Sequence, residues 1–185
     1  MHIAGIARLS LSSTSNGILI FNNSGNANTV SIQSGTTTAS HTLILPAAQG
    51  AAGTYLKNDG AGNLSWQAPS SVTEVTSASA ITTTGTTDVL ATGMTVTPGA
   101  GNYIVMCSGM FSNSFKLGIT YISIYVNGVK IASSERNQDG ASGNIPFATQ
   151  TYVSLLAGQA IEIRWRVNGN TGTLAERSLI VQKIN

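Results

Sequence analysis

The sequence predicts an all-β protein in two regions, a short intertwined β shaft over residues 1–72 and an antiparallel sandwich over residues 73–185. Three observations support this fold class. Apolar and polar residues alternate with a period of two in short runs, Gly, Asn, Asp or Pro separates these runs, and the one Ala-rich stretch, residues 46–53, is broken by two glycines. Because each glycine costs about 1 kcal/mol inside a helix, at most one helical turn is expected there.

The composition excludes several partners. Only 9% of the 185 residues are charged and the net charge is +2, so we expect no phosphate-binding surface and no nucleic-acid partner. No apolar run approaches the roughly 20 residues of a membrane-spanning helix, so no membrane insertion is expected. The first residues lack a basic leader, so no secretory signal is recognised. A single cysteine, Cys107, excludes an intramolecular disulfide.

The first region is expected to contain five short strands, at residues 17–22, 28–34, 40–46, 54–59 and 63–67. Short strands with few large side chains cannot build a two-sheet interior, and isolated hairpins are marginal in water. Other copies of the chain must therefore supply the missing cover, which favours a fibre shaft of two or three chains. Residues 68–80 are small and polar and contain Pro69, so we expect a junction without a strand core.

The second region is expected to form a β-sandwich. Its predicted strands span residues 86–97, 102–111, 119–127, 129–136, 147–156, 160–167 and 176–184. Asn127-Gly128 joins two of them and predicts a tight hairpin, because both residues adopt positive φ readily.

The faces of these strands differ. In residues 160–167, Ile161, Ile163, Trp165 and Val167 alternate with Glu162, Arg164 and Arg166, so one face packs inward and the other meets water. Residues 102–111 and 176–184 are apolar on both faces. A sandwich strand has only one face toward its own core, so the sheet with these two strands is the predicted subunit interface.

Four segments of the second region carry a family resemblance: residues 97–111 with Gly-Asn-Tyr at 101–103, 121–131 with the Asn-Gly hairpin, 153–167 with the Ala-Gly-Gln turn, and 178–184. They resemble the trimeric jelly roll of tumour-necrosis-factor (TNF) and complement globular-head domains. Residues 40–70 resemble a module that precedes the tips of phage tail fibres and bacterial surface fibres. These resemblances imply a homotrimer with a receptor-recognising tip, located outside the cell on a virion tail fibre or a bacterial cell-surface fibre.

Chain reversal places successive connections at alternate ends of the sandwich. Residues 97–101, 127–128 and 157–159 are tight, whereas 112–118, 137–146 and 168–175 are longer and should gather at the other end. We expect these loops to bind a cell-surface glycan or protein. The candidate ligand-binding residues are Asn113, Phe115, Lys116, Arg136, Asn137, Gln138, Asp139, Asn144, Asn168 and Asn170. The alternative is that Asn, Gly and Ser serve turn geometry alone.

Other chemistry is weakly indicated, and we expect a non-enzymatic protein without a cofactor or metal. Glu135 and Asp139 are the nearest carboxylate pair, but nothing suggests the separation or raised pKa that glycan hydrolysis needs. Cys107 is expected to be a buried, inert thiol. His41 is expected to face solvent, an ion on a threefold axis being the alternative. Residues 59–63 favour a hairpin turn over a calcium loop. The rival functions are a capping or trimerisation domain and a glycan-degrading tip.

Overall fold

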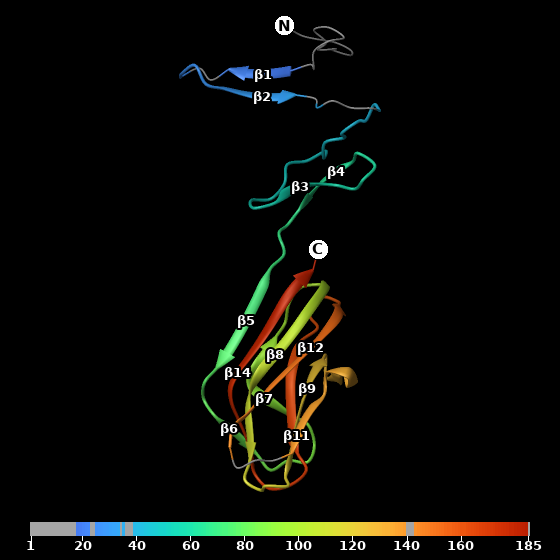
Figure 1. Cartoon of the computed structure of the whole chain (residues 1–185). Coiled ribbons are helices and arrows are strands. Elements are labelled where there is room, and N and C mark those ends of the chain that lie inside the picture. The colour runs from blue at the N-terminus through green and yellow to red at the C-terminus, as the bar shows by residue number, and fades with distance from the viewer. Residues whose placement is uncertain (1–17, 23–24, 34, 36–38, 140–142, 185) are drawn as a thin grey trace. The chain divides into compact units, whose positions relative to one another are not determined.

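The computed structural model describes residues 18–184 apart from 23–24, 34, 36–38 and 140–142. The chain divides into two compact units, residues 1–67 and 68–185 (Figure 1). The expected boundary at 72 falls instead on the first residue of a strand of the second unit. Every strand pair is antiparallel, as predicted for an all-β protein. Among the described residues, no helix is long and apolar enough to cross a membrane.

The first unit contains two hairpins. β1 (Ile18–Asn22) pairs with β2 (Thr29–Gln33), and β3 (Tyr55–Asn58) pairs with β4 (Leu64–Gln67). The strand expected at 40–46 is wrong, since only Ile44 pairs there, in a single parallel bridge to Asn63. Among the described residues, the backbone of Ile44 bonds only to the β3–β4 turn and the start of β4: its N–H donates to the carbonyl of Gly62 and its carbonyl accepts the N–H of Leu64.

The β3–β4 turn is the hairpin that the sequence predicts at residues 59–63. The Asp59 carboxylate accepts hydrogen bonds from the backbone N–H of Ala61 and Asn63, and Gly60 and Gly62 take φ of 87° and 94°. Beside it, the Trp66 indole N–H donates to the carbonyl of Ala48 at 2.8 Å. These local contacts shape the hairpin without building an interior.

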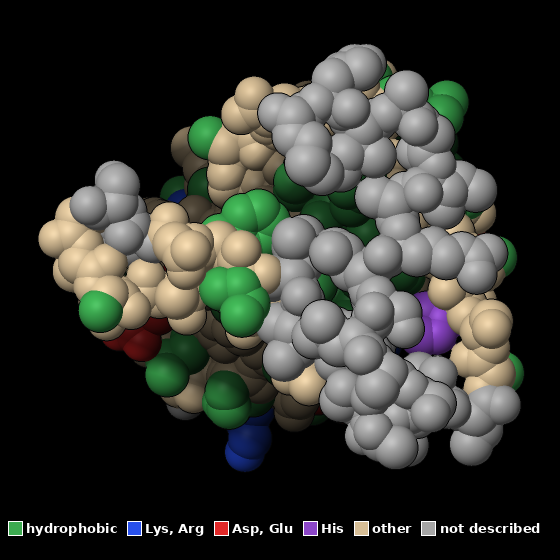
Figure 2. All heavy atoms as spheres, turned by 90° about the horizontal axis from the view of Figure 1, so that it is seen from above, with side chains coloured by type: hydrophobic (Ala, Val, Ile, Leu, Met, Phe, Trp, Pro, Cys, Tyr) green, Lys and Arg blue, Asp and Glu red, His purple; other side chains and the backbone are tan. Residues whose placement is uncertain are grey.

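None of the described residues from 20 to 67 is buried. Large apolar side chains stand in solvent instead, among them Ile32 at 65% exposed, Leu45 at 70% and Trp66 at 41%. Figure 2 shows hydrophobic side chains at the surface in a view with few charged groups. Within the described residues of the first unit, these large apolar side chains are therefore left exposed.

The second unit is a sandwich of two sheets, which we call sheet A and sheet B. Sheet A has the order β12-β8-β14-β5, with β6 also on β14, and sheet B has the order β10-β9-β13-β7, with β11 also on β9. The strands are β5 (Val72–Ser77), β6 (Ile81–Thr83), β7 (Val89–Val96), β8 (Gly101–Asn113), β9 (Ile119–Val126), β10 (Val129–Lys130), β11 (Arg136–Asp139), β12 (Ile145–Leu155), β13 (Ile161–Val167) and β14 (Gly172–Ile184). The long strands alternate between the sheets along the chain, which gives the jelly roll that the sequence predicts.

The expectation of a junction at 68–80 is wrong, because β5 occupies Val72–Ser77 and pairs with the end of β14. Pro69 precedes the strand and so removes no ladder hydrogen bond. Val75 packs against the core. One partly buried valine is enough to hold β5 in the sheet because β14 supplies the backbone hydrogen-bond partners of this strand.

The continuous strand expected at 129–136 is also wrong. β10 ends after two residues, a 3₁₀ turn (Ala132–Ser134) follows, and β11 then returns to β9. The buried Ser134 hydroxyl donates to the carbonyl of Ile131 and accepts the N–H of Ile124, so a side chain replaces the ladder at this point. The Asn127-Gly128 hairpin is confirmed, with φ of 49° and 78°.

The core lies between the two sheets. Ile161, Ile163, Trp165 and Val167 of β13 are all at most 1% exposed, and the residues between them are half-buried, as the alternation predicts. Cys107 is buried, and burial raises the pKa of its thiol to about 12. The thiol is therefore neutral at ordinary pH, as expected for an inert core cysteine.

Candidate functional site

Two connections of the second unit lie together at one end of the sandwich, the end we call distal. They are residues 114–118, between β8 and β9, and residues 168–171, between β13 and β14. Gly172 pairs with Asn113 at this end, whereas Val72, where β5 begins, pairs with Gln182 near the other end of β14. The second unit therefore presents these loops opposite to the point where the chain enters it (Figure 1).

Asn113 joins the two loops. Its side chain is 2% exposed, its carbonyl oxygen accepts the N–H of Phe115 at 3.0 Å, and its amide donates to the carbonyl of Gly169 at 3.3 Å. Gly118 packs directly on this amide, where a Cβ would overlap the Asn113 side chain. The sequence placed Asn113 among the ligand-binding residues, and the structure places it beneath them as a support.

Further bonds cross between the loops. Ser114 N–H donates to the carbonyl of Thr171 at 2.9 Å, and Thr171 N–H donates to the Ser114 hydroxyl at 3.1 Å. Asn168 accepts the N–H of Ile119 through its side-chain oxygen at 2.7 Å. We call residues 113–118 and 168–171 the distal platform. Its loops are held to each other by backbone and side-chain bonds, so its shape is set before any ligand arrives.

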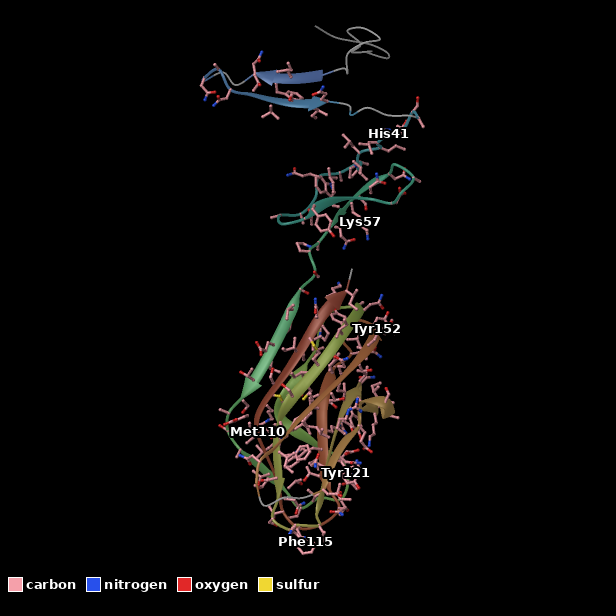
Figure 3. All side chains as sticks on the ribbon, viewed as in Figure 1. His41, Lys57, Met110, Phe115, Tyr121 and Tyr152 are labelled. Carbon is pink, nitrogen blue, oxygen red and sulfur yellow. The ribbon has the colours of Figure 1, made fainter. Side chains whose placement is uncertain are left out.

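The distal platform exposes one short apolar segment. Phe115 is 49% exposed and Leu117 is 72% exposed, and Lys116 between them is exposed as well. Figure 3 shows Phe115 at the tip of the second unit, pointing away from the sheets. Phe115 and Lys116 were predicted from the sequence, but Leu117 was not. A large apolar residue inside a predicted turn is the signal that could have identified it.

The remaining predicted residues are spread more widely. Arg136, Asn137, Gln138 and Asp139 are exposed and together form strand β11, whereas the sequence predicts that a strand ends at Arg136 and that a loop begins at residue 137. The loop expected at 168–175 likewise ends at residue 171, since β14 begins at Gly172. Asn144, Asn168 and Asn170 are exposed at the sandwich end. Asp139 pairs with Ile119, so β11 runs up to the distal platform.

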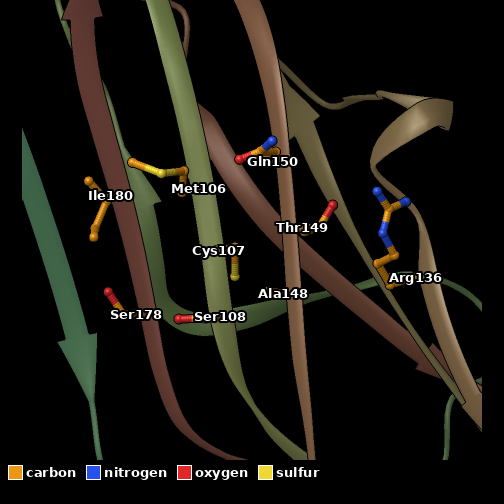
Figure 4. Close-up of a pocket in the computed structure, with 9 residues that line it drawn as sticks. All are labelled: Met106, Cys107, Ser108, Arg136, Ala148, Thr149, Gln150, Ser178 and Ile180. Atoms are coloured by element: carbon orange, nitrogen blue, oxygen red, sulfur yellow. The ribbon is translucent and has the colours of Figure 1, made fainter.

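A hollow lies on the outer face of sheet A (Figure 4). Its floor is made of small residues on three neighbouring strands, Ser108, Ala148 and Ser178, and Met106 and Ile180 form part of its rim. Its volume is about 450 Å³, and Arg136 lines it from β11. The rim continues along the same face to Ile104, which is 37% exposed, and Tyr152, which is 60% exposed.

Sheet B carries a charged network on its outer face, formed by Asp88, Lys130, Glu135 and Arg166. Arg166 bonds Asp88 at 3.0 Å and Glu135 at 2.8 Å, and Lys130 contacts the same two carboxylates. The Arg166 guanidinium also lies 3.9 Å from the centre of the Tyr121 ring. The sequence predicts a solvated face here, and the structure adds that its charges are half-buried and mutually paired.

The network lowers the pKa of both carboxyl groups. Burial alone would raise the pKa of Asp88, but hydrogen bonds from Tyr125 and Arg166 outweigh it. The hydrogen bond from Arg166 is the largest cause of the lowered pKa of Glu135. Both groups are therefore anionic near neutral pH. This is the opposite of what a general acid in glycan hydrolysis requires.

No group of three metal-ligating side chains occurs among the described residues. His41 is exposed, beside residues 58–62 of the β3–β4 hairpin (Figure 3). The exposed position agrees with the expected solvent-facing side chain. The alternative, an ion on a threefold axis, needs other copies of the chain and is not tested by one chain.

No family model matches the sequence, and a search of curated proteins finds no match. The solved structures that are similar in part include the following three. Eiger TNF from S. frugiperda matches with a TM-score of 0.46 at 12% identity, over 63% of this chain and 94% of that protein. The VP2 subviral particle of infectious bursal disease virus matches with a TM-score of 0.46 at 12% identity, over 65% of this chain and 35% of that protein. The C-terminal domain of EclA, a sugar-binding protein, matches with a TM-score of 0.31 at 15% identity, over 61% of this chain and 79% of that domain.

Proposed function

We propose that this chain is the receptor-binding tip region of a homotrimeric extracellular fibre, of virion or bacterial origin, and that it is not an enzyme. The first unit forms part of an intertwined shaft, and the second unit binds a cell-surface glycan or protein through its distal loops. The observation that carries the proposal is the distal platform: two loops cross-bonded in advance, at the end opposite to where the chain enters the sandwich. A rigid scaffold that presents fixed loops is typical of binding modules.

The uncovered apolar surface supports association of several chains. Residues 20–67 contain no buried side chain where described, so their strands need cover from outside the chain. The outer face of sheet A adds Ile104 and Tyr152, which are exposed, and Met106, which is half-buried. Burying such surface between copies stabilises an assembly by roughly 25 cal/mol per Å². Three identical tips would then strengthen weak contacts to a repeated receptor.

The proposal is tested by shortening the platform. Residues 114–118 are replaced by a two-residue Asn-Gly turn, and attachment of the purified full chain to bacterial cells is compared with that of the unmodified chain. We expect attachment to be lost while light scattering still gives three times the 19.0 kDa chain mass.

The rival trimerisation domain is favoured by the same apolar face of sheet A, and it makes a different prediction. If the second unit served association alone, the shortened variant would attach as well as the unmodified chain. A monomeric mass at micromolar concentration would contradict both the tip and the trimerisation domain.

A further inference from the structure

We propose that the distal platform binds a protein partner through an apolar contact, with Phe115 and Leu117 entering a pocket and Lys116 meeting a carboxylate at its edge. This inference rests on the proposed function, and it narrows the class of ligand from a glycan or a protein to a protein.

Two of the platform's three asparagine side chains, Asn113 and Asn168, form hydrogen bonds within the second unit. The Asn113 amide is buried and bonded to Phe115 and Gly169, and the Asn168 oxygen already accepts the N–H of Ile119. A glycan site needs free amide and carboxylate groups for sugar hydroxyls. Here Asn113 uses both its amide nitrogen and its oxygen, and Asn168 uses its oxygen, to hold the loops in place.

The exposed surface of the loop 114–118 beyond Ser114 is an apolar pair, Phe115 and Leu117, on either side of one positive charge. Leu117, at 72%, is as exposed as any large hydrophobic residue among those described, and Phe115 is half exposed beside it. The loops 114–118 and 168–171 contain no carboxylate, so Lys116 has no partner within them. An aromatic and an aliphatic side chain fixed on a rigid turn are typical of the anchor residues of protein interfaces.

The geometry lowers the cost of binding. Gly118 N–H donates to the carbonyl of Phe115 at 2.9 Å, which closes the turn that carries all three side chains. Asn113 fixes the same turn from below. Because the backbone is already ordered, little conformational entropy is lost when the apolar side chains enter a pocket.

The chain offers a matched control. Leu156 is also 72% exposed, but it follows β12 at the opposite end of the sandwich. Leu117→Ala and Leu156→Ala therefore remove the same side chain from equally exposed positions, and only the first lies on the platform.

The experiment measures binding of the fluorescently labelled full chain to a panel of bacterial cells, either untreated, digested with proteinase K or oxidised with periodate. We expect binding that proteinase K abolishes and periodate spares. The double variant Phe115→Ala/Leu117→Ala should bind about tenfold or more weakly. Leu156→Ala should bind like the unmodified chain, and Lys116→Glu, which keeps the apolar pair, should reduce binding less than the double variant.

Other outcomes overturn the inference. Binding lost after periodate and kept after proteinase K would identify a glycan, and the adhesive tip would stand. Binding to protein-free vesicles of phosphatidylethanolamine and phosphatidylglycerol would identify a membrane surface. Full binding by the double variant would place the contact elsewhere. No binding of the unmodified chain to any cell would overturn the proposed function together with the inference.

Discussion

The two units are built from the same alternating β pattern, yet only one of them has an interior. Every buried hydrophobic residue among those described lies in the second unit, from Ala91 to Val181. In the first unit, strands of four or five residues pair as two-stranded hairpins, and no described side chain from residue 20 to 67 is buried. The difference teaches that alternation specifies strands, whereas burial requires a second layer. The second unit has that layer, and the described residues of the first unit do not supply one.

The sharpest test of this contrast uses the two tryptophans of the chain, one in each unit. Trp165 is 1% exposed and Trp66 is 41% exposed. Trp165→Ala should lower the free energy of unfolding by about 3–5 kcal/mol, because it empties a packed core site. Trp66→Ala should lower it by less than about 1 kcal/mol in an isolated chain. Urea denaturation followed by far-ultraviolet circular dichroism measures both.

Protein concentration sharpens the same comparison. If other copies of the chain cover Trp66, Trp66→Ala should lower the free energy of unfolding by more as protein concentration rises, because folding and association are then linked. Suppose that Trp66→Ala and Trp165→Ala lowered the free energy of unfolding equally in a monomeric sample. The first unit would then have an interior of its own, and the basis for a shaft would be removed.

A glycine substitution in each unit has a smaller expected effect. Gly118→Ala places a Cβ against the Asn113 side chain and should destabilise the second unit by about 1–3 kcal/mol through overpacking. Gly50→Ala places a Cβ against Trp66 and should displace the indole, with little change in the unfolding midpoint. Denaturation measures the first, and the indole N–H resonance of Trp66 measures the second.

Gly99→Ala is the control for both, since nothing lies within 4 Å of the added Cβ. A loss of stability from Gly99→Ala equal to that from Gly118→Ala would mean that the platform is not tightly packed. The rigid turn on which the protein-binding inference depends would then lose its support.

Much of the fold could be predicted because it follows local pattern. The alternation of β13 placed Ile161, Ile163 and Trp165 inward, and Asn127-Gly128 fixed a hairpin by backbone preference alone. The strand at 72–77 was missed because its signal is weak and its stability comes from β14, more than 100 residues later in the chain. Pairing between strands so far apart in the sequence leaves no local sequence pattern.

Side chains that break the alternation could not be predicted either. Glu176 takes a φ of 45° in a bulge of β14, and Arg177 after it is 3% exposed. Its guanidinium donates to the carbonyls of Ser79 and Thr92, from two different segments. The candidate site could be predicted only in part for the same reason. Phe115 was recognisable as an aromatic residue in a loop. The supporting role of Asn113 and the strand at 136–139 depend on tertiary contacts, which the local sequence does not reveal.

The smallest expected effect comes from the charged network, which has no counterpart among the described residues of the first unit. The folded-state pKa values of Asp88 and Glu135 lie below their usual range, so at low pH the unfolded chain binds more protons than the folded one. The stability that these groups contribute is present above their unfolded pKa, near 4, and is lost as pH falls through the lower folded values. Each pair is expected to contribute about 1 kcal/mol.

Urea denaturation between pH 6 and pH 3 measures this loss. In Glu135→Gln the dependence of the unfolding free energy on pH should be shallower, because one of the network's two carboxylates with lowered pKa is absent. Glu74→Gln, on an exposed position of β5, is the control and should keep the slope of the unmodified chain. If Glu135→Gln kept the full slope, acid sensitivity would lie outside the network. The paired charges of sheet B would then be a surface feature, and burial between the sheets alone would distinguish the second unit from the first.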